Sequence, residues 1–278
     1  MSANIDQYKR EFASFSGKCP YACLHCYTFT PEYHTVGEES ISKIVNRLSG
    51  KNPDIIYISG HKENFIYPSQ GLELGEKLFD AYHCDIMMTT RNVFEENEIK
   101  RLAELNYRMN NEGKDLFFCI SIPALESYKK LESNPAIPTP YQRMKFLSEV
   151  YNQGIDTFLT IKPLCPTEYI PIDEALKIIE ECKNYSTVVL SSGIVVDDYI
   201  LKRLKGFPTS FSSEKAPLME CLENNISVQY VNVSEELNKI ESLCNEYDIP
   251  FFQHSMPAVQ YVKKMRHKGN NDDDNISK

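Results

Sequence analysis

The sequence predicts an α/β protein built on a parallel sheet, because short apolar segments alternate with segments of helical periodicity along most of the chain. Several apolar segments, such as IIYIS and LFFCISI, are hydrophobic at nearly every position, which is typical of strands buried on both faces. Six strand–helix repeats end near residue 192. Six repeats are too few for a closed eight-stranded barrel, so we expect an open, partial barrel.

The predicted elements follow one another in regular order. Strands are expected at 11–16, 54–59, 85–90, 116–122, 157–162 and 187–192, and helices between them at 40–48, 72–82, 95–109, 141–153 and 173–184. Asp54, Asp85 and Asp115 lie at the starts of their strands after polar or Gly-containing stretches, and so they mark where the strands begin.

After Gly193 the pattern changes to a C-terminal α/β extension. A helix at 197–205, a loop at 206–217, a strand at 227–233, a helix at 235–246, a strand at 250–254 and a helix at 258–266 are expected. The tail GNNDDDNISK has nothing to bury, so disorder is predicted. We therefore expect a barrel at 1–195, an extension packing on it at 196–268 and a disordered tail at 269–278.

Composition narrows the function classes. The 278 residues carry a formal net charge of −9, which makes non-specific nucleic-acid binding unexpected, and the basic run KKMRHK at 263–268 is interpreted as a solvated helix end. No apolar run reaches the roughly 20 residues that span a bilayer. With no membrane or secretion segment, a cytoplasmic location is expected, where nine cysteines are not a disulfide framework.

Three cysteines stand close together in the segment GKCPYACLHCYTF, directly after the first predicted strand. The spacing Cys19-x3-Cys23-x2-Cys26 does not fit one face of a strand or helix, but a loop can gather such thiols around a metal. A [4Fe–4S] cube has four irons, so three ligands leave one iron open for a group that is not protein. The alternatives are a zinc site, to which His25 or His34 would contribute, and three incidental thiols.

The spacing and position of these cysteines resemble the signature of the radical S-adenosylmethionine superfamily, C-x3-C-x2-C after the first strand of a partial (β/α)6 TIM-like barrel. The resemblance covers about residues 10–195. It implies a [4Fe–4S] cluster whose open iron binds S-adenosylmethionine. It also implies one-electron cleavage to a 5′-deoxyadenosyl radical, which abstracts hydrogen from a substrate. Relatives usually have an aromatic residue before the third cysteine, where this chain has His25.

Ligands of parallel α/β proteins bind at the carboxyl ends of the strands, so residues that end the predicted strands are candidate cofactor ligands. The second strand ends at Ser59, Gly60 and His61, where many superfamily members bind the methionyl amino group; alternatively, Gly60 only makes the turn. Arg91 ends the third strand, and its guanidinium suits the methionyl carboxylate. The alternative for Arg91 is a surface residue that caps the next helix.

Further candidates end the fourth and fifth strands. Ser121 is a candidate ribose ligand, whereas Cys119 is interpreted as a buried structural thiol. Lys162 is a candidate cofactor ligand in a region that packs near the adenine in the superfamily. The segment KLESNPAIPTPYQRMKFL resembles the spore photoproduct lyase-like branch, whose Glu and early helical Arg correspond to Glu132 and Arg143.

The late segment FFQHSMPAVQYV predicts a strand followed by a helix. His254 at the strand end is a candidate catalytic residue, because an imidazole transfers protons near neutral pH. Alternatively, Ser255 only caps the helix, with Pro257 in its first turn. The remaining cysteines show no C-x2-C pair and are interpreted as small buried residues: Cys84, Cys119, Cys165, Cys182, Cys221 and Cys244.

These features together predict a radical S-adenosylmethionine enzyme with one [4Fe–4S] cluster and S-adenosylmethionine as cofactors. Its expected partners are an unidentified substrate (a small molecule, a peptide or a nucleotide derivative) and an external one-electron reductant such as flavodoxin or ferredoxin. The alternative is a non-catalytic iron–sulfur electron carrier or sensor. Three clustered ligands rather than four, on a large α/β scaffold, favour the enzyme.

Overall fold

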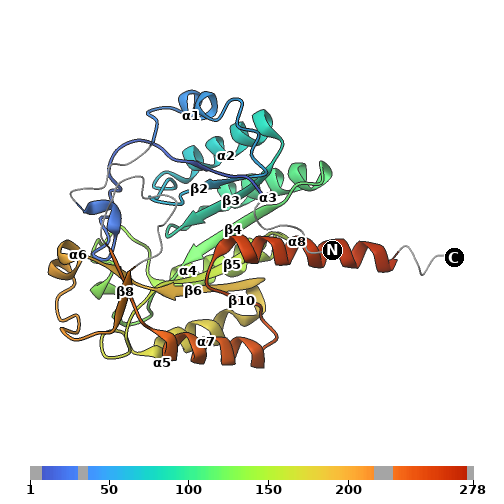
Figure 1. The fold of residues 1–278 in the computed structure, drawn as a ribbon. Coiled ribbons are helices and arrows are strands. Elements are labelled where there is room, and N and C mark those ends of the chain that lie inside the picture. The colour runs from blue at the N-terminus through green and yellow to red at the C-terminus, as the bar shows by residue number, and fades with distance from the viewer. Residues whose placement is uncertain (1–7, 31–36, 216–227, 274–278) are drawn as a thin grey trace.

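Seven parallel strands form the central sheet of the structure, a computed structural model that describes residues 8–30, 37–215 and 228–273 (Figure 1). Their spatial order is β1-β2-β3-β4-β5-β6-β10. The strands are β1 (Arg10–Ala13), β2 (Ile55–Ile58), β3 (Asp85–Thr90), β4 (Leu116–Ser121), β5 (Asp156–Leu164), β6 (Val188–Gly193) and β10 (Phe251–Phe252). The first six match the predicted strands, so the partial TIM-like barrel is confirmed.

Five helices connect these six strands: α1 (Ile41–Arg47), α2 (Pro68–Tyr82), α3 (Glu96–Asn111), α4 (Pro140–Tyr151) and α5 (Ile172–Cys182). Short 3-10 turns lie at Tyr27–Phe29, Ser127–Lys130 and Lys183–Tyr185. Helix α2 begins before the predicted residue 72 because Pro68 suits the first helical turn, where its missing N–H is not needed. Helix α4 also begins with a proline, after a capping box made by Thr139 and Gln142.

Each strand divides its side chains between two apolar clusters, because successive residues point to opposite faces. The outer cluster joins residues such as Ile56, Met88 and Phe118 to the connecting helices. The inner cluster consists of Ile55, Tyr57, Met87, Phe117, Cys119, Phe158, Val188 and Leu190, together with residues of the C-terminal helix. The sheet is therefore buried on both faces, as its continuous apolar segments predict.

The C-terminal helix α8 (Ser255–Asp273) covers the inner face of the barrel. Its Ala258, Val259 and Val262 are buried in the inner cluster, and Figure 1 shows the helix lying across the strands. The sequence predicted a shorter helix packing beside the barrel, whereas this helix lies within it. It extends to Asp273, and disorder of the tail stays a prediction.

Acidic residues at the amino ends of β3, β4 and β5 pair with basic residues of α8. Lys263 Nζ contacts Asp85 and lies 3.0 Å from Asp115 Oδ2. Arg266 pairs with Asp115 and with Asp156. The interpretation of KKMRHK as a solvated helix end is therefore wrong for Lys263 and Arg266. Parallel strands begin at the same edge of a sheet, so the aspartates at their starts lie close together there.

A second sheet, antiparallel, follows β6. It has the order β7-β9-β8, with β7 (Val195–Val196), β8 (Ser213–Lys215) and β9 (Gln229–Val231), and with helices α6 (Asp198–Arg203) and α7 (Ser234–Glu246) beside these strands in the chain. The predicted loop at 206–217 was wrong at 213–215, because pairing with distant β9 makes that segment a strand. The domain boundaries at 195 and 268 stay predictions.

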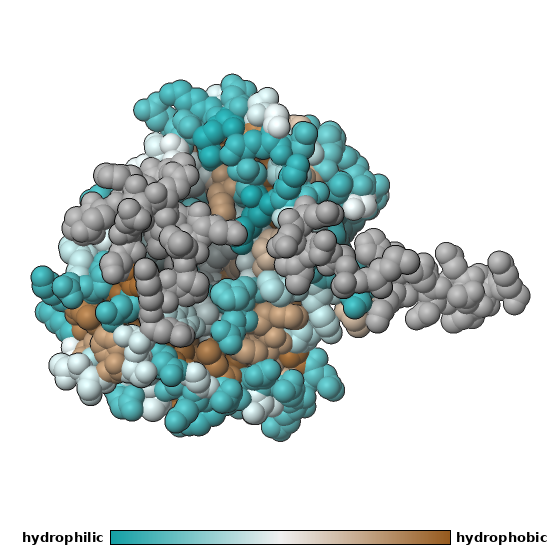
Figure 2. Space-filling model, in the orientation of Figure 1, coloured by the Kyte–Doolittle hydropathy of each residue, from teal (hydrophilic) through white to brown (hydrophobic). Residues whose placement is uncertain are grey.

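The surface contains both hydrophilic and hydrophobic regions. In Figure 2, hydrophilic residues predominate over α1 and α2 at the top, and hydrophobic residues lie among them in the lower half. Most of the large hydrophobic residues that are exposed are tyrosines, such as Tyr67 and Tyr107. Among the helices of the described part of the chain, none combines the length and apolar character needed to cross a bilayer.

The ion pairs of α8 generate a prediction for Asp85, whose side chain is 3% exposed and accepts hydrogen bonds from Tyr8, Lys263 and the Asp115 N–H. Asp85→Asn should lower the free energy of unfolding by about 1.5–3 kcal/mol, because it weakens several charge-assisted bonds in a buried site. Asp80→Asn is the control, since its pair with Arg108 is solvent-exposed and worth about 0–1 kcal/mol. Equal losses on chemical denaturation would contradict this role of Asp85.

Candidate functional site

The three clustered cysteines lie in the loop after β1, at the carboxyl end of the sheet. Cys19 and Cys23 are buried, Cys26 is half-buried, and all three thiols are free. They share one small apolar cluster with Tyr21 and Ile137. The fold therefore brings the three predicted ligands together in one place.

Burial and neighbouring charges set the ionisation of these thiols. Burial raises the pKa of Cys23 to about 12 and also raises the pKa of Cys26, while Arg91 acts in the opposite direction on both. The hydroxyl of Thr28 lies 2.9 Å from Cys26 Sγ and favours the thiolate there. Thiols of this kind lose their protons when they coordinate a metal.

Backbone hydrogen bonds fold the cysteine loop into tight turns. The Ala22 N–H donates to the Cys19 carbonyl at 3.3 Å, and the Cys26 N–H donates to the Cys23 carbonyl at 3.1 Å. Ala22 has a φ of +46°, in the left-handed region that a residue with a Cβ seldom adopts. This conformation persists only where surrounding contacts hold it.

Arg203, at the end of α6, supplies such contacts from about 180 residues away in the chain. Its Nη2 donates to the carbonyls of Cys23 at 2.7 Å and of Ala22 at 3.0 Å, and its Nη1 donates to the Cys26 carbonyl at 3.4 Å. The guanidinium also lies 5.2 Å from the centre of the Phe29 ring. The sequence analysis missed Arg203, because no local pattern marks a residue that acts on a distant loop.

Arg91 belongs to a buried network of charges. Its Nε donates to Glu132 at 2.7 Å, and the other oxygen of that carboxylate accepts from Arg143 Nη2 at 2.6 Å. The side chains of Glu132 and Arg143 are fully buried. Burial alone would lower the pKa of Arg91, but Cys23 and Glu132 outweigh burial and raise it. Arg91 is not the helix cap of the alternative interpretation, since Glu95 caps α3.

Glu63 is a second site residue that the sequence analysis missed. Its carboxylate is buried and accepts hydrogen bonds from the Thr90 hydroxyl at 3.0 Å, the Arg91 N–H at 2.7 Å and the Phe65 N–H at 2.9 Å. Burial raises the pKa of Glu63, and the three hydrogen bonds lower it by a smaller amount. Glu63 therefore fixes the backbone of Arg91, while Glu132 fixes its side chain.

The loop after β2 places Ser59, Gly60 and His61 near the cysteine loop. Ser59 has a φ of +66°, and its hydroxyl accepts a backbone hydrogen bond within its own loop. A Cβ at Gly60 would lie 2.7 Å from the Phe12 ring, so the absence of a side chain allows that close contact. Burial lowers the pKa of His61 to about 4, and its Nδ1 lies 3.2 Å from the Tyr27 hydroxyl.

A buried hydroxyl lies at the carboxyl end of β4, and a second lies beside it on β5. Ser121 Oγ has no hydrogen-bond partner among the described residues, whereas the Thr160 hydroxyl interacts with the Cys119 thiol. The two residues are paired in register. Cys119 lies in the inner cluster, and burial raises its pKa to about 12, as expected for a structural thiol.

Lys162 lies on β5, and His254 lies in the turn between β10 and α8. Lys162 Nζ donates to the Gln253 carbonyl at 2.6 Å, which joins β5 to the turn between β10 and α8. Burial lowers the pKa of Lys162 to about 8. His254 follows Gln253 and is exposed, and burial, Lys162 and Arg10 lower its pKa. Helix α8 begins at Ser255, so His254 directly precedes the helix.

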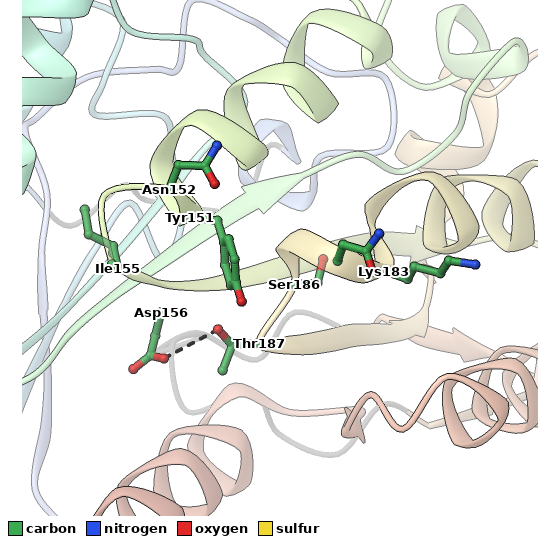
Figure 3. Close-up of a pocket in the computed structure, with 9 residues that line it drawn as sticks. Tyr151, Asn152, Ile155, Asp156, Lys183, Ser186 and Thr187 are labelled. Atoms are coloured by element: carbon green, nitrogen blue, oxygen red, sulfur yellow. Dashed lines mark hydrogen bonds between the residues drawn. The ribbon is translucent and has the colours of Figure 1, made fainter.

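A surface hollow lies elsewhere, at the amino ends of β5 and β6. It measures about 630 Å³ and is lined by Tyr151, Asn152, Gly154, Ile155, Asp156, Lys183, Asn184, Ser186 and Thr187. Figure 3 shows the hydrogen bond between Asp156 and Thr187 on one of its walls. None of the candidate ligands lies there, so this hollow is separate from the site at the carboxyl ends.

His25 and His34 are the additional ligands of the alternative zinc site. Within the described residues, no three His, Cys, Asp or Glu side chains converge as they would around one metal ion. His25 is buried, and burial followed by the charge of Arg91 lowers its pKa to about 3. His34 and Cys221 lie outside the described residues. The other isolated cysteines are buried, as predicted: Cys84, Cys119, Cys165, Cys182 and Cys244.

Arg203→Met should loosen the cysteine loop, because it removes three hydrogen bonds that hold the carbonyls of Ala22, Cys23 and Cys26. At about 0.5–1.5 kcal/mol each, their loss should raise the alkylation rate of the loop thiols in the metal-free protein by about tenfold or more. Mass spectrometry after timed iodoacetamide labelling measures this rate. Arg101→Met, which removes a surface pair with Glu76, is the control. Equal labelling of the two variants would show that Arg203 does not order the loop.

The comparisons with known proteins show the fold. No protein-family model matches the chain, and neither does any curated protein. Among solved structures, SuiB of Streptococcus suis bound to S-adenosylmethionine has a TM-score of 0.51 at 12% identity, covering 88% of this chain and 50% of SuiB. SuiB bound to its precursor peptide SuiA has a TM-score of 0.54 at 11% identity, covering 88% of this chain and 48% of SuiB.

A third structure, anSMEcpe with bound AdoMet, has a TM-score of 0.53 at 12% identity, covering 87% of this chain and 62% of anSMEcpe. This chain therefore spans about half the length of SuiB and less than two thirds of anSMEcpe. The shared architecture is the partial α/β barrel with its helices, which extends over most of this chain.

Proposed function

We propose that this protein is a radical S-adenosylmethionine enzyme that binds a [4Fe–4S] cluster on Cys19, Cys23 and Cys26. The observation that carries the proposal is the position of the three thiols, gathered in one loop at the carboxyl end of an open parallel barrel. The resemblance of that barrel to two proteins solved with S-adenosylmethionine supports it. When bound, the cluster would supply one electron to cleave S-adenosylmethionine and produce a 5′-deoxyadenosyl radical.

The donor set fits the cluster better than it fits a single ion. Each thiolate on a cube binds a different iron, so the sulfur atoms need not converge on one point. The three thiols share one apolar cluster, whereas a zinc site usually adds a fourth Cys or His ligand. Three ligands leave one iron open for S-adenosylmethionine, and Arg203 holds the carbonyls of the loop around them.

Residues beside the cysteine loop are assigned to the cofactor. Arg91, oriented by Glu132 and near Cys23, would hold the methionyl carboxylate through its terminal nitrogens. The loop at 59–61 would receive the methionyl amino group. The unpartnered hydroxyl of Ser121 would accept a bond from the ribose or donate one to it.

The substrate and the other partners are proposed more broadly. SuiB was solved with its precursor peptide, which supports a peptide as one substrate class beside a small molecule or a nucleotide derivative. The buried pair of Glu132 and Arg143 supports the spore photoproduct lyase-like branch. Flavodoxin or ferredoxin as reductant and a cytoplasmic location stay predictions, as does His254 as a catalytic residue.

Cluster content and product formation test the proposed function. Protein prepared anaerobically should contain about four irons and four sulfides, and reduced protein mixed with S-adenosylmethionine should release 5′-deoxyadenosine. Cys23→Ala should lose the iron–sulfur absorbance and the product, because it removes one of only three ligands. Metal analysis, absorbance and chromatography measure these outcomes.

Cys84→Ala is the matched control, since Cys84 is buried at the amino end of the sheet and should leave the cluster intact. Stoichiometric zinc in the anaerobic protein would contradict the cluster. A full cluster without any 5′-deoxyadenosine would instead support the non-catalytic electron carrier.

Arg91→Ala tests the carboxylate assignment. Loss of a charge-assisted pair should weaken the binding of S-adenosylmethionine by about 1.5–3 kcal/mol, or roughly 10- to 150-fold. Equilibrium binding to the cluster-loaded protein measures this change. Arg101→Ala, on the outer surface of α3, should bind like the wild type. If Arg91→Ala folds, holds its cluster and binds S-adenosylmethionine normally, Arg91 has no role in cofactor binding.

A further inference from the structure

Arg203 brings a positive charge to the backbone of the cysteine loop, beside which α6 lies (Figure 1). Its guanidinium bonds only backbone carbonyls there, those of Ala22, Cys23 and Cys26. Among the described residues, no aspartate or glutamate forms an ion pair with Arg203. A carbonyl oxygen carries only a partial negative charge, so these bonds orient the cation without neutralising it.

Two aromatic rings fix the guanidinium of Arg203 in place. Its Cζ lies 5.2 Å from the ring centre of Phe29, in the turn after the third cysteine, and 5.6 Å from that of Tyr199 on α6 itself. A planar, delocalised guanidinium suits such stacking. Arg203 is half-buried, so solvent screens its charge only in part.

Lys62 makes the same kind of contact at the start of the loop. From the segment after β2, its Nζ donates to the carbonyls of Ser16 at 2.6 Å and Gly17 at 3.1 Å, shortly before Cys19. Within the part of the chain that the structure describes, Lys62 has no carboxylate partner either. Two cations from distant parts of the chain therefore bond the backbone of one cysteine loop.

The third cation near these thiols, Arg91, is compensated, because its Nε donates to the buried carboxylate of Glu132 at 2.7 Å. The charges of Arg203 and Lys62 are not. Holding a loop does not by itself require a charge, since a neutral amide also donates to a carbonyl. Asn134 does so in this loop, where its Nδ2 donates to the Pro20 carbonyl at 2.9 Å. Cations without carboxylates therefore indicate that the loop itself holds negative charge.

We propose that Arg203 and Lys62 raise the reduction potential of the cluster, an inference that rests on the proposed function. Three thiolates bring negative charge to the loop and uptake of one electron adds more, so a nearby cation stabilises the reduced form more than the oxidised form. The buried, apolar surroundings of Cys19 and Cys23 strengthen this interaction. Arg203 has the larger effect, because it bonds the carbonyls of two cysteines.

Redox titration of the cluster-loaded protein with dithionite, followed by electron paramagnetic resonance, measures this potential without substrate or S-adenosylmethionine. At a fixed solution potential, Arg203→Met should lower the ratio of reduced to oxidised cluster about tenfold, which is a fall of about 59 mV for a one-electron couple. Lys62→Met should lower the ratio by a smaller factor. Arg203→Lys should keep most of the wild-type potential, because the charge remains.

Asn134→Ala is the matched control, because it removes a neutral donor to a carbonyl of the same loop and should leave the potential unchanged. Arg203→Gln separates charge from hydrogen bonding, since the glutamine amide is neutral but still donates to a carbonyl. Its potential should fall as in Arg203→Met, even where its cluster content equals that of the wild type.

Equal potentials in the wild type, Arg203→Gln and Arg203→Met would overturn the inference and leave Arg203 a purely structural residue, as would loss of the cluster in every Arg203 variant. An equal fall in Asn134→Ala would assign the effect to the order of the loop instead of to charge. Wild-type protein without an iron–sulfur cluster would contradict the proposed function as well. A cluster whose potential does not shift in the variants would contradict this inference alone.

Discussion

An open barrel of seven strands leaves an apolar inner face that its own strands do not cover. Helix α8 covers that face, with Val259 and Val262 in the inner cluster. The aspartates at the strand starts hold it there through Lys263 and Arg266. The carboxyl half of the barrel is left for polar side chains, and the candidate site lies there because the other half is filled.

Charged side chains of opposite sign lie at the two ends of the barrel strands. The amino ends hold aspartates that α8 neutralises, whereas the carboxyl ends hold cations around Arg91 and around Lys162. Glu132 is the exception, since it is buried between Arg91 and Arg143 and serves to orient Arg91. Such a distribution of charge favours an anionic ligand group at the carboxyl end of the sheet.

The region after β6 contributes to both ends of the barrel. Through Arg203 it holds the cysteine loop, and through α8 it fills the inner face and places His254 beside Lys162. A region that contacts both the cysteine loop and the core takes part in forming the site. Its removal would expose the inner cluster and release the loop, so the barrel and the extension depend on each other.

The sequence by itself determined the six strands, the five connecting helices and the grouping of Cys19, Cys23 and Cys26, because alternation, apolar runs and close spacing are local properties. It also identified Arg91 and Lys162 as strand-end residues. Only the tertiary structure decided that α8 lies within the barrel, that 213–215 is a strand, and that Arg203 holds the cysteine loop. Those contacts join residues far apart in the chain, and their energy comes from burial and pairing that no short segment of sequence contains.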